Sequence, residues 1–320
     1  MTIFRKAVDH LSRRLLNQSK SVELVSMLDI YSWRPTFRIA EECVVFPMDS
    51  RFYPCGFADK LKGIISAYAY AKANGQRFII DHRFPFVLSE YLLPKYNWLE
   101  YEIVDYNVWN TKRIYVIDRG ADVSPLYKRY KKQCHICTNI DAIDLINKQY
   151  GSSFSFSQLF HELFYLSPLI ENEMVKYKKE IDSDYISVSF RFVNLLGDFE
   201  EYGHYPLDMP AQLELMENCR KLIATLYSRF DGKYKVLVTS DSQKFIDSIS
   251  YLEYIYLIPG SIGHSGSDGS LQTMIKTMLD FFMISEARYV FLGKIGLMYA
   301  SQFAKIAAAV NDVPFEIVSE

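Results

Sequence analysis

Polar residues follow the carboxyl ends of several predicted strands in the second half of the sequence. Arg191 ends one such strand, Asp241 follows the next, and His264 lies in a loop, residues 260–269, that is rich in Gly and Ser. Ligands of parallel sheets bind outside the carboxyl ends of the strands, and a small-residue loop before a helix lets backbone N–H groups approach a phosphate. The pattern therefore predicts a nucleotide-binding pocket. The alternative for the loop is an ordinary surface segment.

Metal-binding and common nucleotide motifs give weaker signals. Neither the dinucleotide fingerprint G-x-G-x-x-G nor the P-loop pattern G-x-x-x-x-G-K-[ST] occurs in the sequence. Asp182 and Asp184 form an Asp-x-Asp pair, but they precede a predicted strand, at the edge opposite the pocket, so we interpret them as part of a turn. Cys134 and Cys137 lack a second ligand pair at a suitable distance, and structural zinc needs four ligands. We therefore expect ordinary thiols and no bound metal.

Strands that alternate with helices must position these residues. Hydrophobic periodicity predicts strands at 42–48, 77–81, 101–106, 113–118, 185–192, 234–239, 254–258 and 288–292, and helices at 59–73, 158–180 (broken near 167–168), 210–228, 242–250, 271–285 and 299–309. Such alternation indicates an α/β protein whose parallel sheets are covered by helices on both faces. A length of 320 residues favours two domains, which we place at 1–168 and 169–320.

Composition narrows the class of protein. The chain is 49% hydrophobic and has a formal net charge of -2, from 36 Lys and Arg against 38 Asp and Glu, which argues against a dedicated nucleic-acid-binding protein. No apolar run reaches the roughly 18 residues that a membrane span needs. The first residues lack the apolar core of a signal peptide, and five Cys are an odd, sparse set, so we expect a cytoplasmic protein.

The first forty residues are predicted to be mostly helical. Phe4, Val8, Leu11, Leu15 and Leu16 recur at helical spacing, with Lys and Arg between them. A basic amphipathic helix of this kind can lie on an anionic membrane surface. The sequence leaves two interpretations open: the helix packs on its own domain, or it gives peripheral contact with the inner face of the membrane.

Several short segments, in order, resemble the fucosyltransferase superfamily, in particular the nodulation fucosyltransferase and the core α-1,6-fucosyltransferases. The similarity spans roughly residues 54–308 and rests on CGFADKL (55–61), GQRFIID (75–81), SFR (189–191), HS (264–265), LDFFMIS (279–285) and YASQFAKIA (299–307). The resemblance implies a GT-B-like α/β fold, with two facing Rossmann-like domains and a cleft between them. It also implies an inverting, metal-independent enzyme that moves fucose from GDP-fucose to a glycan or lipid-linked glycan, with no cofactor beyond the donor. The first domain is then the acceptor side and the second binds the nucleotide sugar.

The resemblance also assigns roles to individual residues. Arg191 corresponds to the arginine that holds the donor diphosphate, a role that suits a bidentate guanidinium. Ser301 and Gln302 correspond to phosphate-binding residues at a helix start, and Asp280 to the acid that selects guanine, whose N1 and N2 edge carries only donors. The remaining donor-binding positions are Asp241 and His264 in the second domain and Gly56 and Phe57 in the first.

Transfer to an acceptor hydroxyl needs a base, usually a carboxylate. An acidic residue in the loop after the arginine serves in the core enzymes, which points to Asp198 first and Glu200 second; solvated surface acids are the alternative. His82 follows a predicted strand, where it either contacts acceptor or is structural. The sequence does not identify the acceptor.

Some positions depart from the family pattern. Ser189 stands where the family has His, Phe192 where a basic residue is usual, and Ala300 replaces the first Ser of the late pair. Two alternatives therefore stay open beside a GDP-fucose enzyme. One is the same fold with another nucleotide sugar, such as a UDP- or dTDP-linked donor, and the other is an inactive nucleotide- or glycan-binding relative.

Overall fold

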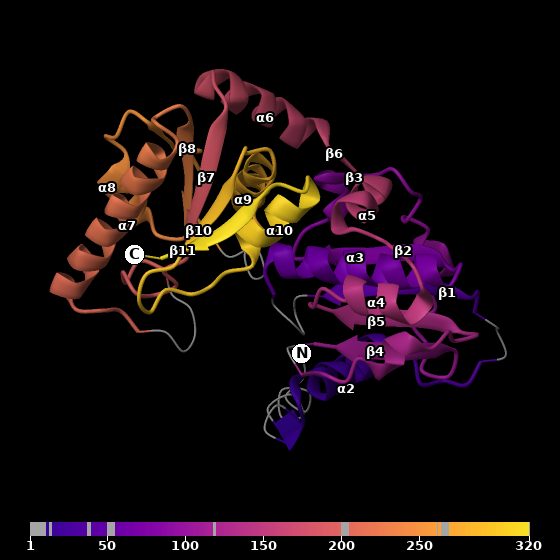
Figure 1. Cartoon of the computed structure of the whole chain (residues 1–320). Helices are drawn as coiled ribbons and strands as arrows, with labels where there is room; N and C mark the ends of the chain where they lie inside the picture. The colour runs from indigo at the N-terminus through magenta and orange to yellow at the C-terminus, as the bar shows by residue number, and fades with distance from the viewer. Residues whose placement is uncertain are drawn as a thin grey trace. The chain divides into compact units, whose positions relative to one another are not determined.

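The computed structural model describes residues 11–12, 15–36, 40–49, 55–117, 120–199, 205–260, 262–263 and 269–319 (Figure 1). The chain divides into two compact units, Met1–Tyr165 and Leu166–Glu320, and each unit contains its own parallel sheet. Most of the predicted basic N-terminal helix lies outside the described residues, although Leu11 and Leu15 are described and exposed. Among the described helices, none is both long and apolar enough to cross a bilayer.

The first unit is built on a four-stranded parallel sheet in the order β2-β1-β5-β4. Its strands are β1 (Cys43–Asp49), β2 (Arg77–Phe84), β4 (Thr111–Val116) and β5 (Gln133–Thr138), and its helices are α2 (Gln18–Ile30), α3 (Phe57–Ala73), α4 (Ile143–Tyr150) and α5 (Phe156–Leu163). Single 3-10 turns lie at η1 (Leu88–Glu90), η2 (Tyr101–Ile103) and η3 (Ser124–Tyr127). A small sheet joins β3 (Leu92–Pro94) to β6 (Phe164–Leu166).

Alternation along β2 determines which side chains face α3. Phe78 points toward the helix, where its ring lies 5.3 Å from that of Tyr68. Side chains two residues apart share one face of a strand, so His82 belongs to the same face as Phe78. Ile79 points to the opposite face and joins a buried cluster with Cys43. The face under α3 therefore carries an ionisable group at the carboxyl end of β2.

One strand prediction in the first unit was wrong, and one strand of its main sheet was not predicted. The stretch 101–106 has β-branched and aromatic residues, but it forms the 3-10 turn η2 followed by irregular chain. The missing strand is β5, which carries polar side chains that the sequence does not mark as buried. Gln133 and His135 are fully buried in it, and His135 shares hydrogen bonds with the hydroxyl of Tyr31 (2.6 Å) and the amide oxygen of Gln133 (2.9 Å).

The second unit contains a five-stranded parallel sheet in the order β11-β10-β7-β8-β9. Its strands are β7 (Tyr185–Phe190), β8 (Lys235–Ser240), β9 (Ile255–Tyr256), β10 (Val290–Gly293) and β11 (Phe315–Val318), and its helices are α6 (Pro168–Ile181), α7 (Met209–Arg229), α8 (Gln243–Ile249), α9 (Leu271–Ser285) and α10 (Phe303–Val310). Figure 1 shows α7 and α8 on one side of the sheet and α9 and α10 on the other. The edge strand β11 was not predicted, whereas the other four strands were.

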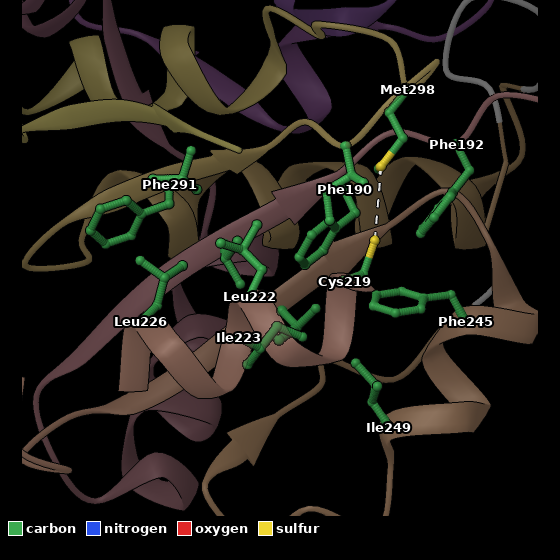
Figure 2. Packing of buried hydrophobic residues seen from close by; sticks show 14 of the residues in the cluster. Phe190, Phe192, Cys219, Leu222, Ile223, Leu226, Phe245, Ile249, Phe291 and Met298 are labelled. Atoms are coloured by element: carbon green, nitrogen blue, oxygen red, sulfur yellow. Dashed lines mark hydrogen bonds between the residues drawn. The ribbon is translucent and has the colours of Figure 1, made fainter. Parts of the chain in front are cut away.

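An apolar core fixes the carboxyl end of β7 against α7 and α8 (Figure 2). The ring of Phe245 lies 5.2 Å from that of Phe190 and 5.0 Å from that of Phe192. Beside them, the Sγ of Cys219 lies 3.8 Å from the Sδ of Met298. The residues that flank Arg191 on both sides are therefore core residues, which holds its backbone in place.

Candidate functional site

Strands β7 and β8 bring the first two candidate residues together. The strands are parallel, and Ser189 pairs with Thr239 in their register. The hydroxyl groups of these two residues lie 2.7 Å apart and are buried. Because both strands end at the same edge of the sheet, the residues that follow them, Arg191 and Asp241, become neighbours.

Asp241 organises the turn that follows β7. Its Oδ1 accepts a hydrogen bond from the backbone N–H of Phe192 (2.8 Å), and its Oδ2 accepts one from Val193 (2.7 Å). The Nη1 of Arg191 lies 3.2 Å from Oδ2. Val193 has a positive φ of 57°, a conformation that is rare for a β-branched residue. We infer that the carboxylate of Asp241 holds this strained turn and orients the guanidinium beside it.

Arg191 and Asp241 form an ion pair in which the arginine is the more exposed partner. The side chain of Arg191 is 21% exposed and that of Asp241 is 5% exposed. Burial raises the pKa of Asp241 above its ordinary value, and the charge of Arg191 and the backbone N–H bonds act against that rise. The guanidinium of Arg191 also lies over the ring of Phe199, 4.8 Å from its centre. The result is a partly exposed cation, held on two sides at the carboxyl edge of the sheet.

Asp198 lies next to this turn and contacts the start of α8. Its Oδ2 accepts hydrogen bonds from the hydroxyl of Ser242 and from the backbone N–H of Lys244, both at 2.8 Å. Ser242 itself caps α8 by accepting from the backbone N–H of Phe245. The carboxylate therefore stabilises the helix start, a role that the sequence did not reveal because its partners are more than forty residues away. Glu200 lies outside the described residues.

The start of α10 is attached to the same edge. The backbone N–H of Tyr299 donates to the carbonyl of Arg191 (3.1 Å). Ser301 accepts a hydrogen bond from the backbone N–H of Phe303 (3.2 Å), and Gln302 is the N-cap residue. Both Ser301 and Gln302 are partly exposed. The structure thus places these two polar side chains on the segment that is hydrogen-bonded to Arg191.

Asp280 is held by a partner that the sequence analysis missed. Both of its carboxylate oxygens lie 2.5 Å from the Nζ of Lys276, one turn earlier on α9. Burial raises the pKa of Asp280, and Lys276 lowers it. The i, i+4 spacing of acid and base was the signal that could have revealed the pair. The ring of Phe281 contacts that of Phe303, at 5.3 Å, which connects this part of α9 to α10.

Gly260, which follows β9, lies close to Lys276 of the same ion pair. Gly260 has a φ of 140°, and a Cβ built on it would lie only 2.9 Å from the Cδ of Lys276. Glycine is therefore required by both the backbone conformation and the close approach. His264, the candidate from this loop, lies outside the described residues.

Gly56 and Phe57 form the start of α3 in the first unit. Gly56 is the N-cap residue and has no side chain with which to cap the helix. The side chain of Phe57 is 1% exposed and belongs to the core of its unit. A ligand at this helix start would therefore contact backbone rather than the phenyl ring.

The two metal-like motifs have structural roles. Asp182 ends α6 in the left-handed conformation, and Asp184 accepts a hydrogen bond from the Nε of Arg288 (3.0 Å). Cys134 and Cys137 are buried in β5 as free thiols, and burial raises the pKa of both. Within the described part of the chain, no group of three or more His, Cys, Asp or Glu side chains is arranged to hold a metal ion.

Two of the positions that depart from the family pattern, Ser189 and Phe192, are buried in the second unit. Ser189 forms the buried hydroxyl pair with Thr239. Phe192 is fully buried among Phe190 and Phe245, so a charged residue there would be desolvated. The backbone N–H of Phe192 donates to Asp241, while its ring packs in the core.

No family model matches this sequence, and no curated protein matches it either. Solved structures match over most of the chain. The NodZ α-1,6-fucosyltransferase co-crystallised with GDP matches with a TM-score of 0.51 at 16% identity, over 84% of this chain and 92% of that one. NodZ soaked with GDP-fucose gives a TM-score of 0.52 at 16% identity, over 87% and 94%. A mutant of Arabidopsis thaliana FUT1 in complex with GDP gives 0.55 at 12% identity, over 98% and 77%. The chain therefore has the α/β fold of these fucosyltransferases, which confirms the predicted GT-B-like fold class.

Proposed function

We propose that the protein is an inverting, metal-independent glycosyltransferase that moves fucose from GDP-fucose to a glycan acceptor. The observation that carries the proposal is the position of Arg191. It directly follows β7 at the carboxyl edge of the sheet, in a fold shared with proteins whose crystals hold GDP and GDP-fucose. A partly exposed guanidinium at such an edge suits the binding of a diphosphate leaving group.

The donor-binding residues have complementary roles in this proposal. Arg191 stabilises the charge that develops on the departing diphosphate, and Asp241 keeps the guanidinium oriented before the donor arrives. Ser301 and Gln302 offer hydrogen bonds to a phosphate at the start of α10, where the helix dipole favours an anion. Asp280 accepts from the N1 and N2 groups of guanine. His264 is a further proposed donor-binding residue of the second unit, and Gly56 and Phe57 are the proposed donor-binding residues of the first unit.

The acceptor hydroxyl loses a proton during transfer, and Asp198 and Glu200 are the proposed bases. Asp198 is exposed, but its Oδ2 already accepts two hydrogen bonds at the start of α8. The variant Asp198→Asn separates the two roles, because the amide oxygen can still accept the hydrogen bonds of Ser242 and Lys244 but cannot take a proton. Loss of transfer with unchanged stability would assign Asp198 as the base. Full transfer by this variant would leave Glu200.

The domain roles follow from the same reasoning. Residues 1–168 are proposed as the acceptor side and residues 169–320 as the side that binds the nucleotide sugar. A cytoplasmic enzyme that acts on a lipid-linked glycan would benefit from peripheral membrane contact through the basic N-terminal segment. Co-sedimentation with anionic liposomes tests this contact, and binding that does not weaken with salt, or no binding, would contradict it.

The experiment that tests the proposed function is a thermal-shift panel of GDP, UDP, dTDP and CMP, each with and without EDTA. A ligand at a hundred times its dissociation constant adds about 2.7 kcal/mol of stability. Stabilisation by GDP alone, unchanged by EDTA, supports the proposal and leads to an assay of GDP release from GDP-fucose with a set of glycan acceptors. Stabilisation by another nucleotide would indicate a different donor. GDP binding without turnover would indicate an inactive relative.

A further inference from the structure

Two exposed tryptophans lie near the amino edge of the main sheet in the first unit. Trp33 follows α2 and is 49% exposed, and Trp109 precedes β4 and is 57% exposed. The Nε1 of Trp33 donates to the carbonyl of Met27 (3.2 Å), and that of Trp109 donates to the carbonyl of Trp33 (3.0 Å). The N–H is the one polar group of an indole, so both rings present an apolar surface to the solvent.

Hydrogen bonds hold the two segments that carry these rings together. Ser32 and Asn107 form an isolated parallel bridge. The backbone N–H of Ser32 donates to the carbonyl of Tyr106 (2.7 Å), and that of Val108 donates to the carbonyl of Ser32 (3.1 Å). The side-chain amide of Asn107 also donates to the carbonyl of Arg34 (2.9 Å). The rings are therefore preorganised, which lowers the entropy that a binding partner would have to overcome.

Lysine side chains lie beside the tryptophans at the same edge. Residues 128–132 read KRYKK and lead directly into β5, whose neighbour in the sheet is β4. The Nζ of Lys132 donates to the carbonyl of Trp109 (3.1 Å). The Nζ of Lys112, in β4, lies 5.1 Å from the centre of the Tyr130 ring. Basic and aromatic side chains thus form one continuous surface.

The charge of this surface is largely uncompensated. Lys131 and Lys132 are exposed, and neither forms an ion pair with a carboxylate in the described part of the chain. The nearby Glu42 lies 3.6 Å from Arg129. The first unit as a whole has 22 Lys and Arg against 17 Asp and Glu, whereas the second has 14 against 21. Such asymmetry between the halves of a chain is typical of proteins that bind an anionic surface.

We propose that Trp33, Trp109, Lys112, Lys131 and Lys132 form a face that docks on an anionic lipid bilayer. Tryptophan rings are enriched at the level of the lipid headgroups, where an apolar ring leaves water without entering the hydrocarbon. Lysines beside them are attracted by acidic headgroups. This face is distinct in sequence from the basic N-terminal segment. The proposal goes beyond the proposed function, because it depends on neither the sugar donor nor the reaction.

Co-sedimentation of the full chain with lipid vesicles tests the proposal. We expect binding to vesicles of phosphatidylcholine and phosphatidylserine, and much weaker binding to phosphatidylcholine alone. The double variant Lys131→Gln, Lys132→Gln should bind about thirtyfold more weakly, because each lysine near such a surface contributes about fivefold. The matched control is Lys176→Gln, Lys179→Gln, which removes two exposed charges from α6 of the second unit and should bind like the wild type. Both variants keep the N-terminal segment, so their difference measures the lysine face alone.

Quenching of tryptophan fluorescence by acrylamide gives a second measurement on the wild type. Trp33 and Trp109 are open to the quencher in solution and should become protected on vesicles, whereas Trp98 is fully buried in both states. Equal vesicle binding by the wild type and the Lys131→Gln, Lys132→Gln variant, or unchanged quenching on vesicles, would overturn the proposal. Binding to an RNA oligonucleotide without binding to vesicles would also overturn it and assign a nucleic acid. GDP release with a soluble acceptor should be the same in the wild type and the lysine variant, so the transferase activity is tested separately.

Discussion

Mild acid should destabilise the first unit because two neutral histidines are buried in it. Burial lowers the pKa of both His82 and His135 to about 3. The charge of Lys60 adds to this shift at His82, and the charge of Arg113 adds to it at His135. Hydrogen bonds to the backbone of His82 and Phe86 act against the shift at His82. In the unfolded chain both histidines titrate near 6.5. The folded state therefore binds fewer protons than the unfolded state below that pH. Stability is complete above the unfolded pKa and falls as the pH drops toward the folded pKa.

The size of the effect follows from the number of protons. One proton that binds only to the unfolded state lowers the free energy of unfolding by about 1.4 kcal/mol per pH unit. Between about pH 7.5 and about pH 5, each histidine should remove about 2 kcal/mol, and the two together about 4 kcal/mol. The variant His82→Phe should lose half of this dependence. Its stability at neutral pH should change little, because Phe replaces a buried, neutral aromatic ring with another of similar size.

Tryptophan fluorescence during urea unfolding measures this unit selectively. The chain has three Trp, at positions 33, 98 and 109, and all three belong to the first unit. Wild type and His82→Phe are compared across this pH range, with His161→Gln as the control, because His161 lies exposed on α5. The control should follow the wild type. The same pH dependence in wild type and His82→Phe would refute the reasoning that His82 stays neutral in the folded unit.

Four further predictions concern the second unit. Arg191→Ala should reduce sugar transfer by about a hundredfold or more, measured as GDP release, and near-normal turnover would remove Arg191 from the mechanism. Asp280→Ala should weaken binding of GDP more than that of UDP in calorimetry; equal losses would contradict the guanine assignment. Asp241→Ala leaves two backbone N–H groups and the guanidinium of Arg191 without their acceptor, so urea unfolding followed by circular dichroism should show a loss of about 3–5 kcal/mol. Gly293→Ala places a Cβ 2.2 Å from the Cε1 of Phe190. It should therefore lower the free energy of unfolding by about 1–3 kcal/mol in the same measurement. An unchanged unfolding midpoint would contradict this, because it would show that the strands can shift to make room.

The candidate site in the second unit was partly predictable. A polar residue directly after a buried strand must lie at the carboxyl edge of a parallel sheet, so the sequence could place Arg191 and Asp241 at the same edge. It could not show that Asp241 accepts from the turn after β7, or that Asp198 holds the start of α8. Those contacts depend on the conformation of each loop, and the spacing of residues along the sequence does not predict that conformation.

The first unit was harder to predict because some of its buried strand positions carry polar side chains. Strand β5 lacks an apolar pattern, since Gln133 and His135 satisfy one another and their neighbours inside the sheet. Conversely, the aromatic and β-branched residues of 101–106 favour a strand, but Tyr106 instead donates its hydroxyl hydrogen bond to Asp81. Local propensity is a weak guide where tertiary hydrogen bonds decide the conformation.

The strand order of the first unit also has a consequence for how the chain folds. Strand β1 pairs with β2, the next strand along the chain, and with β5, which comes only after the residues of β3 and β4. Closing the loop to β2 costs less chain entropy than closing the longer loop to β5. We therefore expect β1, α3 and β2 to form the folding nucleus, onto which β5 and β4 assemble later. Lys60 and His82 both belong to that nucleus, so the unit must desolvate a charge and an imidazole at the beginning of folding rather than at its end.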